Sequence, residues 1–373
     1  MTRICHLFDR DAGWEQCRGL SQLLDRLPSD RFTSSLAAID SSAVDLLRSF
    51  GRRVAVLGRR GWPDVVAAPA LSRFLERNEI DLIHAWGARA AHCARAATKK
   101  PLVVELFDPV LASRDTKLIR TIAQPAGLAV VCSCEIVRRR LIEGGVPPDL
   151  TLVIRPGVDF ARINNFRRSG LREELGLARD DTVILAPTPA GVDDGLSDAL
   201  RAVGMLNALT PNVRMILPGR SRSQRRVVRL DRALPIPPTV VSPGDGFSME
   251  ALIAISDVLV TASRGDLSTT CIAWAMASET AVIGSAVHAV AEMIAHKVNG
   301  LLFKPVPGKS MVVSIARLLQ DRESQAKTKE VARGQAYEIF GLRRYADQHS
   351  ALYENVLSGK SPADGITDPA RTA

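Results

Sequence analysis

Short apolar runs alternate with longer amphipathic segments along the first half of the chain. The apolar runs are too short for helices and have the length of buried strands. They predict strands at 3–8, 32–39, 54–57, 82–85, 102–106 and 128–132, with helices at about 14–27, 43–50, 69–78 and 88–97. Strands that alternate with helices of this length indicate parallel pairing with right-handed crossovers.

The second half repeats the pattern. Strands are expected at 182–186, 213–217, 239–241, 258–260 and 281–283, with helices at about 196–209, 249–255, 270–277 and 311–319. The two halves predict two doubly wound, Rossmann-like α/β domains that face each other across a cleft. We expect domains at 1–161 and 177–340, a polar linker at 162–176, a helix at 341–357 that packs back toward the first domain, and a disordered tail at 358–373.

Composition excludes several classes of protein. With 46% hydrophobic residues among 373, the chain can build packed cores and is not disordered throughout. No apolar run reaches the roughly 18 residues that span a bilayer, and charged residues at positions 3, 9, 10 and 11 interrupt any apolar leader. We therefore expect a cytoplasmic protein.

The formal net charge is +9, and 40 of the 49 basic residues are Arg. The excess is spread over both halves, unlike the concentrated basic stripe of a nucleic-acid-binding module, so we expect no nucleic-acid partner. Its densest run, 214–232, holds seven Arg against Asp231. Such a run is either a solvated helix face or a surface that docks on an anionic membrane, which would place the protein at the periphery of the inner membrane. The six cysteines lack the paired spacing of metal ligands, and we expect no metal site.

Ligands of doubly wound sheets bind at the carboxyl ends of the strands, near helix N-termini. Gly13 follows the first strand, where its backbone can approach a ligand or simply form a strand-to-helix turn. His84 ends another strand and is either a contact for a substrate hydroxyl or phosphate, or a structural histidine.

A third segment of this kind runs from 262 to 270. Exposed amides at a helix start, together with hydroxyl groups and a guanidinium, suit a diphosphate. The candidate side chains are Arg264, Asp266, Ser268, Thr269 and Thr270. Asp266 can accept a hydrogen bond from a ligand, and helix capping alone would also explain it.

Several motifs, taken in order, are similar to those of one enzyme family. They are Leu82-Ile-His-Ala-Trp-Gly87, Val153-Ile-Arg-Pro-Gly-Val-Asp159, Ala273-Trp-Ala-Met-Ala277 and Asn299-Gly-Leu-Leu-Phe303. Over about residues 1–355 the chain resembles the family-4 (group 1) glycosyltransferases. The resemblance implies the GT-B fold, a retaining transfer of sugar from a nucleotide donor on the second domain to an acceptor on the first, and no required metal.

The sequence departs from the family at the donor site. The family carries two glutamates where this chain has Asp266 and Trp274, eight positions apart. An indole cannot accept a hydrogen bond from a ribose. The family's Arg and Lys after the first strand of the second domain are also missing, because 184–195 holds no cation. Arg220 or Arg264 would then have to supply positive charge to the diphosphate.

Two functions follow from this comparison. The first is a glycosyltransferase that uses a UDP- or GDP-linked sugar and an unidentified glycan, lipid or small-molecule acceptor, in cell-envelope polysaccharide or glycan synthesis. Asp266 and His84 are its expected catalytic residues, and Gly13, Arg220, Arg264, Ser268, Thr269 and Thr270 are expected to contact the donor and its phosphates. The alternative is a catalytically impaired relative that acts as a binding or partner subunit.

Overall fold

The computed structural model divides the chain into two compact units. Unit 1 comprises Met1–Gly157 and Phe340–Ala373, and unit 2 comprises Val158–Ile339. The structure describes residues 1–9, 13–41, 44–49, 51–58, 64–107, 113–123, 127–167, 170–187, 195–209, 212–219, 222–233, 239–243, 247–265, 269–305 and 310–371.

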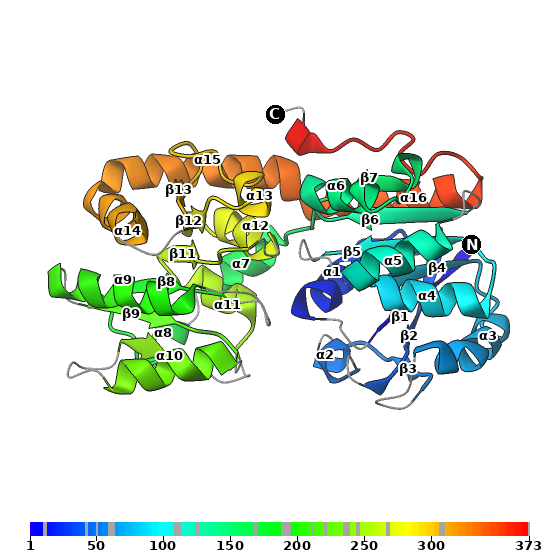
Figure 1. The fold of residues 1–373 in the computed structure, drawn as a ribbon, viewed down its shortest axis with the longest axis horizontal. Coiled ribbons are helices and arrows are strands. Elements are labelled where there is room, and N and C mark those ends of the chain that lie inside the picture. Colours follow the sequence, from blue (N-terminus) through cyan, green and yellow to red (C-terminus); the bar gives the residue numbers. More distant parts are fainter. Residues whose placement is uncertain are drawn as a thin grey trace. The chain divides into compact units, whose positions relative to one another are not determined.

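Unit 1 is built on a parallel sheet of seven strands in the order β3-β2-β1-β4-β5-β6-β7 (Figure 1). The strands are β1 (Thr2–Phe8), β2 (Phe32–Ala38), β3 (Ala55–Val56), β4 (Leu82–Trp86), β5 (Leu102–Leu106), β6 (Leu128–Cys132) and β7 (Thr151–Val153). The helices are α1 (Trp14–Leu24), α2 (Val44–Ser49), α3 (Ala68–Arg77), α4 (Ala88–Ala97), α5 (Ser113–Ile122), α6 (Glu135–Glu143) and α16 (Leu342–Leu357).

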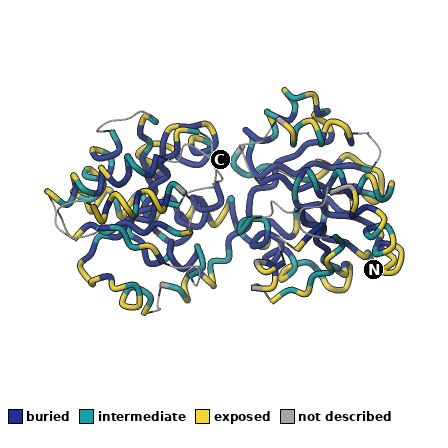
Figure 2. Tube along the Cα trace, turned by 60° about the horizontal axis from the view of Figure 1, so that its bottom comes forward, coloured by how far each residue is buried: buried dark blue, intermediate teal, exposed yellow. Residues whose placement is uncertain are grey.

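The central strands of this parallel sheet are buried on both faces. Every residue of β4, β5 and β6 is buried, as expected when helices cover both faces of a sheet. Figure 2 shows the buried residues of each unit gathered in its strands, with exposed residues on the outer helices. The polar residues among these buried strands therefore need partners inside the core.

The end of the chain completes the core of unit 1. The helix α16 packs against α1 and β5 and contributes the fully buried rings of Tyr345 and Tyr353. The segment after α16 was expected to be disordered, but as far as Arg371 it is described and docked. Its Asp368 accepts two hydrogen bonds from the guanidinium of Arg155, at 2.8 and 2.9 Å. Both side chains are about 95% buried, and a buried Arg requires such a partner.

Unit 2 repeats the architecture with six parallel strands in the order β10-β9-β8-β11-β12-β13. The strands are β8 (Thr182–Leu185), β9 (Val213–Ile216), β10 (Val240–Val241), β11 (Val258–Thr261), β12 (Ala281–Ser285) and β13 (Leu301–Phe303). The helices are α7 (Phe160–Arg167), α8 (Leu171–Glu174), α9 (Leu196–Leu209), α10 (Arg222–Ala233), α11 (Met249–Ala254), α12 (Thr270–Ala277), α13 (His288–Ala291), α14 (Ser310–Gln320) and α15 (Arg322–Phe340).

The expected linker at 162–176 is instead part of unit 2. It forms most of α7 and all of α8, and α7 packs against α11. Arg172 anchors α8 by donating to the carbonyl of Asp181 at 2.6 Å and pairing with Asp257 at 3.4 Å. The Arg-rich composition that suggested a linker therefore serves the packing of this segment. Among the described helices, none has the length and apolar character needed to cross a membrane.

Candidate functional site

In unit 2, the segments that follow β8 and β11 lie against each other at the carboxyl edge of the sheet. The two strands are neighbours, and Gly195, with φ +59°, lies on the segment after β8, directly before α9. A Cβ on Gly195 would lie 2.1 Å from the carbonyl oxygen of Ala262, so only glycine fits there. This contact brings the start of α9 beside the segment that leads to α12.

Arg264 occupies this edge and is held by an ion pair. Its guanidinium donates to Asp198 of α9 at 2.7 Å, and Arg201 donates to the same carboxylate at 2.8 Å. Two guanidinium groups thus share one carboxylate. The Arg264 side chain is 37% exposed, so the group remains accessible to an anion.

The helix α12 begins directly after this edge. Thr269 is its N-cap residue, and both Thr269 and Thr270 are buried. The positive end of the helix dipole therefore points to the same edge as Arg264. Both features favour a negatively charged group there. Three further expected residues, Arg220, Asp266 and Ser268, lie outside the described residues.

Trp274 has no access to solvent. All residues of α12 are buried, and the indole of Trp274 is 0% exposed. At this position, where the resemblance leads us to expect a glutamate, the chain has a core residue. The side chain at position 274 therefore cannot accept a hydrogen bond from a ribose.

In unit 1, the corresponding site is the carboxyl edge of the sheet, where the neighbouring strands β1 and β4 end. Gly13 is the N-cap residue of α1, and its amide donates to Gln16 Oε1 at 2.9 Å. Asp9 directly follows β1 and is 4% exposed. Gly87 follows β4 with φ +121°, and a Cβ there would lie 2.2 Å from the Asp9 carboxylate. The sequence contained a signal for this contact. Asp9 follows β1 and Gly87 follows β4, and these two strands pair with Phe8 beside Trp86.

His84 lies in the core rather than at an accessible edge. Its side chain is 0% exposed, and Nδ1 lies 2.7 Å from the hydroxyl of Tyr353 on α16. Burial lowers the pKa of His84, partly offset by the neighbouring Glu105. These contacts favour the structural interpretation of His84 over direct contact with a substrate.

Two residues that the sequence analysis did not single out complete this cluster. Glu105 Oε2 lies 3.3 Å from His84 Nε2 and 3.1 Å from His349 Nε2. Burial alone would raise the pKa of Glu105, but its two histidine neighbours hold that pKa below its usual value. The sequence contained one signal for this cluster, the carboxylate of Glu105 inside the otherwise apolar strand β5. Its partner His349 is 244 positions away, which sequence spacing does not reveal.

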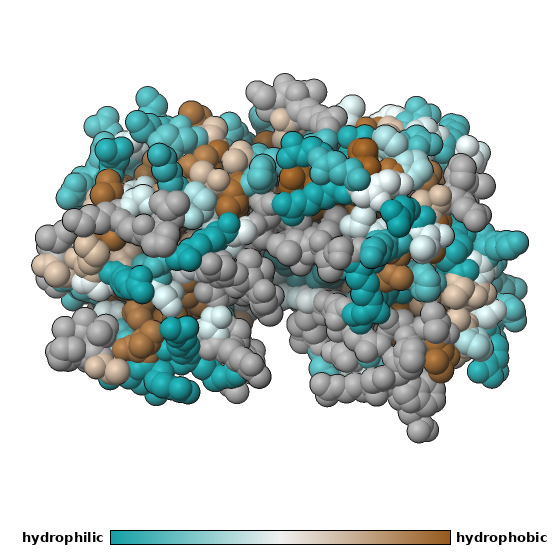
Figure 3. All heavy atoms as spheres, in the orientation of Figure 1, coloured by the Kyte–Doolittle hydropathy of each residue, from teal (hydrophilic) through white to brown (hydrophobic). Residues whose placement is uncertain are grey.

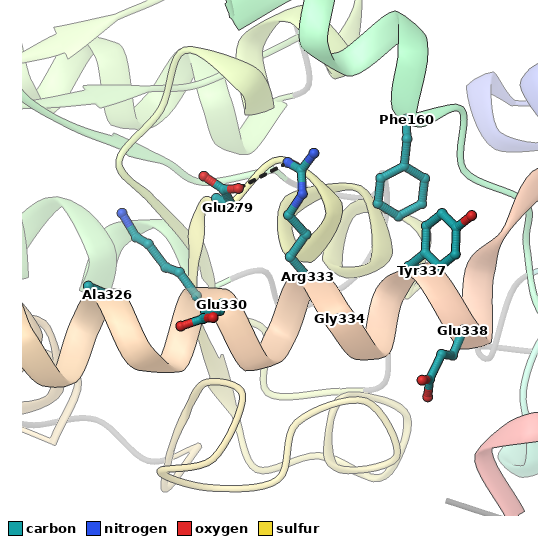
Figure 4. Close-up of a pocket in the computed structure, with 9 residues that line it drawn as sticks. Phe160, Glu279, Ala326, Glu330, Arg333, Gly334, Tyr337 and Glu338 are labelled. Carbon is teal, nitrogen blue, oxygen red and sulfur yellow. Dashed lines mark ion pairs between the residues drawn. The ribbon is translucent and has the colours of Figure 1, made fainter.

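Unit 2 also carries a surface groove of about 750 Å³ beside α15. Its exposed ring is Tyr337, which meets Phe160 edge to face (Figure 4). Arg333 is fixed there by Glu279 at 3.2 Å and by the carbonyl of Ala277 at 2.9 Å. Because Ala277 and Glu279 lie at the C-terminal end of α12, the groove is at the opposite end of that helix from Thr269. It is therefore separate from the anion-attracting edge.

Two family models match consecutive parts of the chain. The model of glycosyltransferase family 4 matches residues 22–162, and that of the group 1 glycosyl transferases matches residues 168–335. Together they account for most of both units.

Known proteins agree with these matches. The N-acetyl-alpha-D-glucosaminyl L-malate synthase of Bacillus anthracis is 20% identical over 310 residues, which is 79% of this chain and 80% of that protein. The structure of Anabaena HepE in complex with UDP and glucose has a TM-score of 0.78 and 21% identity, covering 95% of this chain and all of that one. A glycosyltransferase from Rickettsia africae also reaches a TM-score of 0.78, at 16% identity, covering 95% of this chain and 98% of that one. The fold and the family matches confirm the resemblance seen in the motifs: the chain is a family-4, group 1 glycosyltransferase with two Rossmann-like units of the GT-B type.

Proposed function

We propose that the protein transfers a sugar from a nucleotide-sugar donor to an acceptor hydroxyl, with retention at the anomeric carbon. The observation that carries this proposal is the placement of Arg264, 37% exposed and paired with Asp198 together with Arg201, beside the start of α12. HepE was crystallised with UDP and with UDP-glucose, which favours a UDP-linked donor over a GDP-linked one.

In this proposal the edge stabilises the charge of the leaving diphosphate. The bond between the anomeric carbon and the diphosphate oxygen breaks, and the acceptor oxygen bonds to that carbon on the same face. The acceptor proton passes to the leaving phosphate. Arg264 and the N-terminus of α12 oppose the growing negative charge, with Thr269 and Thr270 at the helix start. These groups take the place of a metal ion, so we propose that transfer requires none.

Unit 1 supplies the acceptor side. Gly13 and Asp9 both follow β1 and mark the carboxyl edge of its sheet, where an acceptor hydroxyl would meet the chain. In this proposal His84 is a buried structural residue beneath this edge and not a catalytic one. The acceptor is a glycan, a lipid or a small molecule, and synthesis of a cell-envelope polysaccharide or another glycan is the proposed role.

The basic helix α10 is the proposed membrane contact. Its only acidic residue, Asp231, is buried and accepts hydrogen bonds from Thr239 and Val240. The exposed side is therefore cationic, and its exposed Arg residues are Arg225, Arg226, Arg229 and Arg232. Figure 3 shows hydrophilic side chains, with hydrophobic ones between them, along the edge of unit 2 where α10 lies. Such a face suits peripheral binding to anionic lipid.

A second candidate function rests on Trp274. An indole in the core at this position removes a hydrogen-bond acceptor from the donor site. In this second proposal the chain keeps the fold but acts as a binding or partner subunit.

One experiment separates the two candidates. Thermal unfolding is measured with UDP, GDP, ADP and their sugar derivatives at millimolar concentration, together with release of nucleotide from each sugar. The transferase hypothesis expects stabilisation by one nucleotide class, loss of that effect in Asp266→Asn, and turnover. An absence of any nucleotide effect in the wild-type chain contradicts it and favours the partner subunit.

A further inference from the structure

Three ligand-type atoms converge inside the core of unit 1. They are His84 Nε2 from β4, Glu105 Oε2 from β5 and His349 Nε2 from α16, and all lie within 4.8 Å of one another. The carboxylate oxygen is 3.3 Å from one imidazole nitrogen and 3.1 Å from the other. The three side chains are at most 1% exposed, so their positions are fixed by packing.

The outer nitrogen of each imidazole is already engaged. His349 Nδ1 lies 2.8 Å from the carbonyl of Tyr345, which can only accept, so Nδ1 carries the proton. His84 Nδ1 lies 2.7 Å from the hydroxyl of Tyr353. Metal-binding histidines nearly always have such a partner at the second nitrogen, because it orients the ring and fixes the tautomer. Both Nε2 atoms are therefore presented to Glu105.

A shared proton does not satisfy all three atoms. One proton can bridge Glu105 and His349 at 3.1 Å, whereas buried His84 Nε2 lies 3.3 Å from the same oxygen without the geometry of a good hydrogen bond. A buried polar atom without a well-formed hydrogen bond is unfavourable in the core. A cation at the point of convergence contacts the three atoms together and neutralises the buried carboxylate.

We propose that His84, Glu105 and His349 bind a divalent transition metal of the Zn(II) class. Zinc ligands at their usual bond lengths lie roughly 3.2–3.5 Å apart in a tetrahedral site, close to the two distances observed. Two imidazoles and one carboxylate form a common ligand set for such ions. The metal would link β4 and β5 to α16 and so hold the end of the chain on unit 1. It has no part in the proposed sugar transfer, so either proposal can fail without the other.

The full-length chain, without an affinity tag that contains histidine, tests this site. It is produced in minimal medium with or without Zn(II) and gel-filtered, and its metal is quantified by mass spectrometry. We expect about one Zn(II) per chain after growth with zinc, and a melting temperature roughly 5–10 °C above that of the zinc-free protein. Growth with Co(II) should add the visible absorption of a four-coordinate site.

His349→Gln and Glu105→Gln should each lose at least nine-tenths of the metal. The control His92→Gln, on α4 and outside the cluster, should retain it. Glu105→Gln keeps the size of the side chain, so a folded circular dichroism spectrum in this variant separates metal loss from unfolding. Less than one-tenth equivalent of metal in the wild-type chain overturns the proposal, as does an equal metal content in all variants. Either result would leave the cluster as a hydrogen-bonded core network.

Discussion

The hydroxyl of Tyr353 lies 2.7 Å from His84 Nδ1, although the two residues are 269 positions apart. This contact joins the second half of α16 to the middle of the sheet of unit 1. It also explains why His84, the middle residue of β4, does not reach solvent, because α16 covers it. The C-terminal helix is thus a component of the core of unit 1.

Removing this hydroxyl should destabilise unit 1. Tyr353→Phe leaves His84 Nδ1 without its partner in a fully buried site, which should cost about 1–3 kcal/mol of unfolding free energy. Urea unfolding followed by circular dichroism measures the loss. The matched control is Tyr337→Phe on α15, whose ring is 70% exposed and whose stability should be unchanged within about 0.5 kcal/mol. Equal stability of the two variants would show that the contact contributes nothing.

The ion pair between Arg155 and Asp368 should stabilise the docked end of the chain. Asp368→Asn leaves the guanidinium of Arg155 buried without a counter-charge, a change that typically costs about 3–5 kcal/mol. Limited proteolysis should then cleave the segment after α16 at lower protease concentration. Asp364→Asn is the control, since this residue is exposed and four positions away. Similar cleavage in both variants would mean that the ion pair does not hold the segment.

Stability should decrease in mild acid because burial lowers the pKa of two histidines. Burial lowers the pKa of His84 and, together with the charges of His84 and His349, lowers the pKa of His6 well below 6.5. The unfolded chain therefore binds protons below about pH 6.5 that the folded chain does not. Each histidine should then remove up to about 1.4 kcal/mol of stability per pH unit between its unfolded and folded pKa.

This prediction can be measured by urea unfolding at pH 7.5, 6.5 and 5.5. His6→Gln should flatten the dependence on pH, since one of the two groups no longer titrates, whatever its effect on stability at pH 7.5. A wild-type stability that is constant from pH 7.5 to 5.5 would contradict the assignment of neutral, buried imidazoles.

Two substitutions at the proposed donor site should change the affinity for UDP in opposite directions. Arg264→Gln should weaken UDP binding roughly tenfold, the loss of one charge-assisted hydrogen bond. Asp198→Asn should strengthen it, because the carboxylate between Arg264 and Arg201 no longer competes with the diphosphate. Isothermal titration measures both, with Arg317→Gln on the exposed face of α14 as the control. Unchanged affinity in both variants would remove Arg264 from the site.

The sequence was sufficient for the fold but not for the arrangement of polar residues inside it. Alternating strands and helices predicted both Rossmann-like units, because local hydrophobic periodicity records which faces are buried. The cluster around Glu105 was missed because its members come from β4, β5 and α16, and pairing over such distances leaves no local pattern. The helices at 162–176 were missed because a high Arg content resembles that of a linker. His84 was placed at a surface because the residue that covers it, Tyr353, lies 269 positions later in the chain.

Binding to an anionic membrane should depend on the exposed arginines of α10. Arg229 and Arg232 are exposed and line a groove with Gly219 and Ser242. Each Arg near an anionic bilayer contributes about 1 kcal/mol, so the double variant Arg229→Gln/Arg232→Gln should bind phosphatidylglycerol vesicles roughly 30-fold more weakly. Co-sedimentation with these vesicles measures the change, and phosphatidylcholine vesicles should bind neither protein.

The control removes the same charge from another helix. Arg73→Gln/Arg77→Gln neutralises two exposed arginines of α3 in unit 1, so it lowers the net charge equally but leaves α10 intact. A specific surface requires that only the α10 variant releases the protein, and that raising the salt concentration releases the wild type, because screening shortens the reach of the charges. If both variants lose binding equally, the attraction comes from the net charge of +9 as a whole and α10 is an ordinary solvated helix.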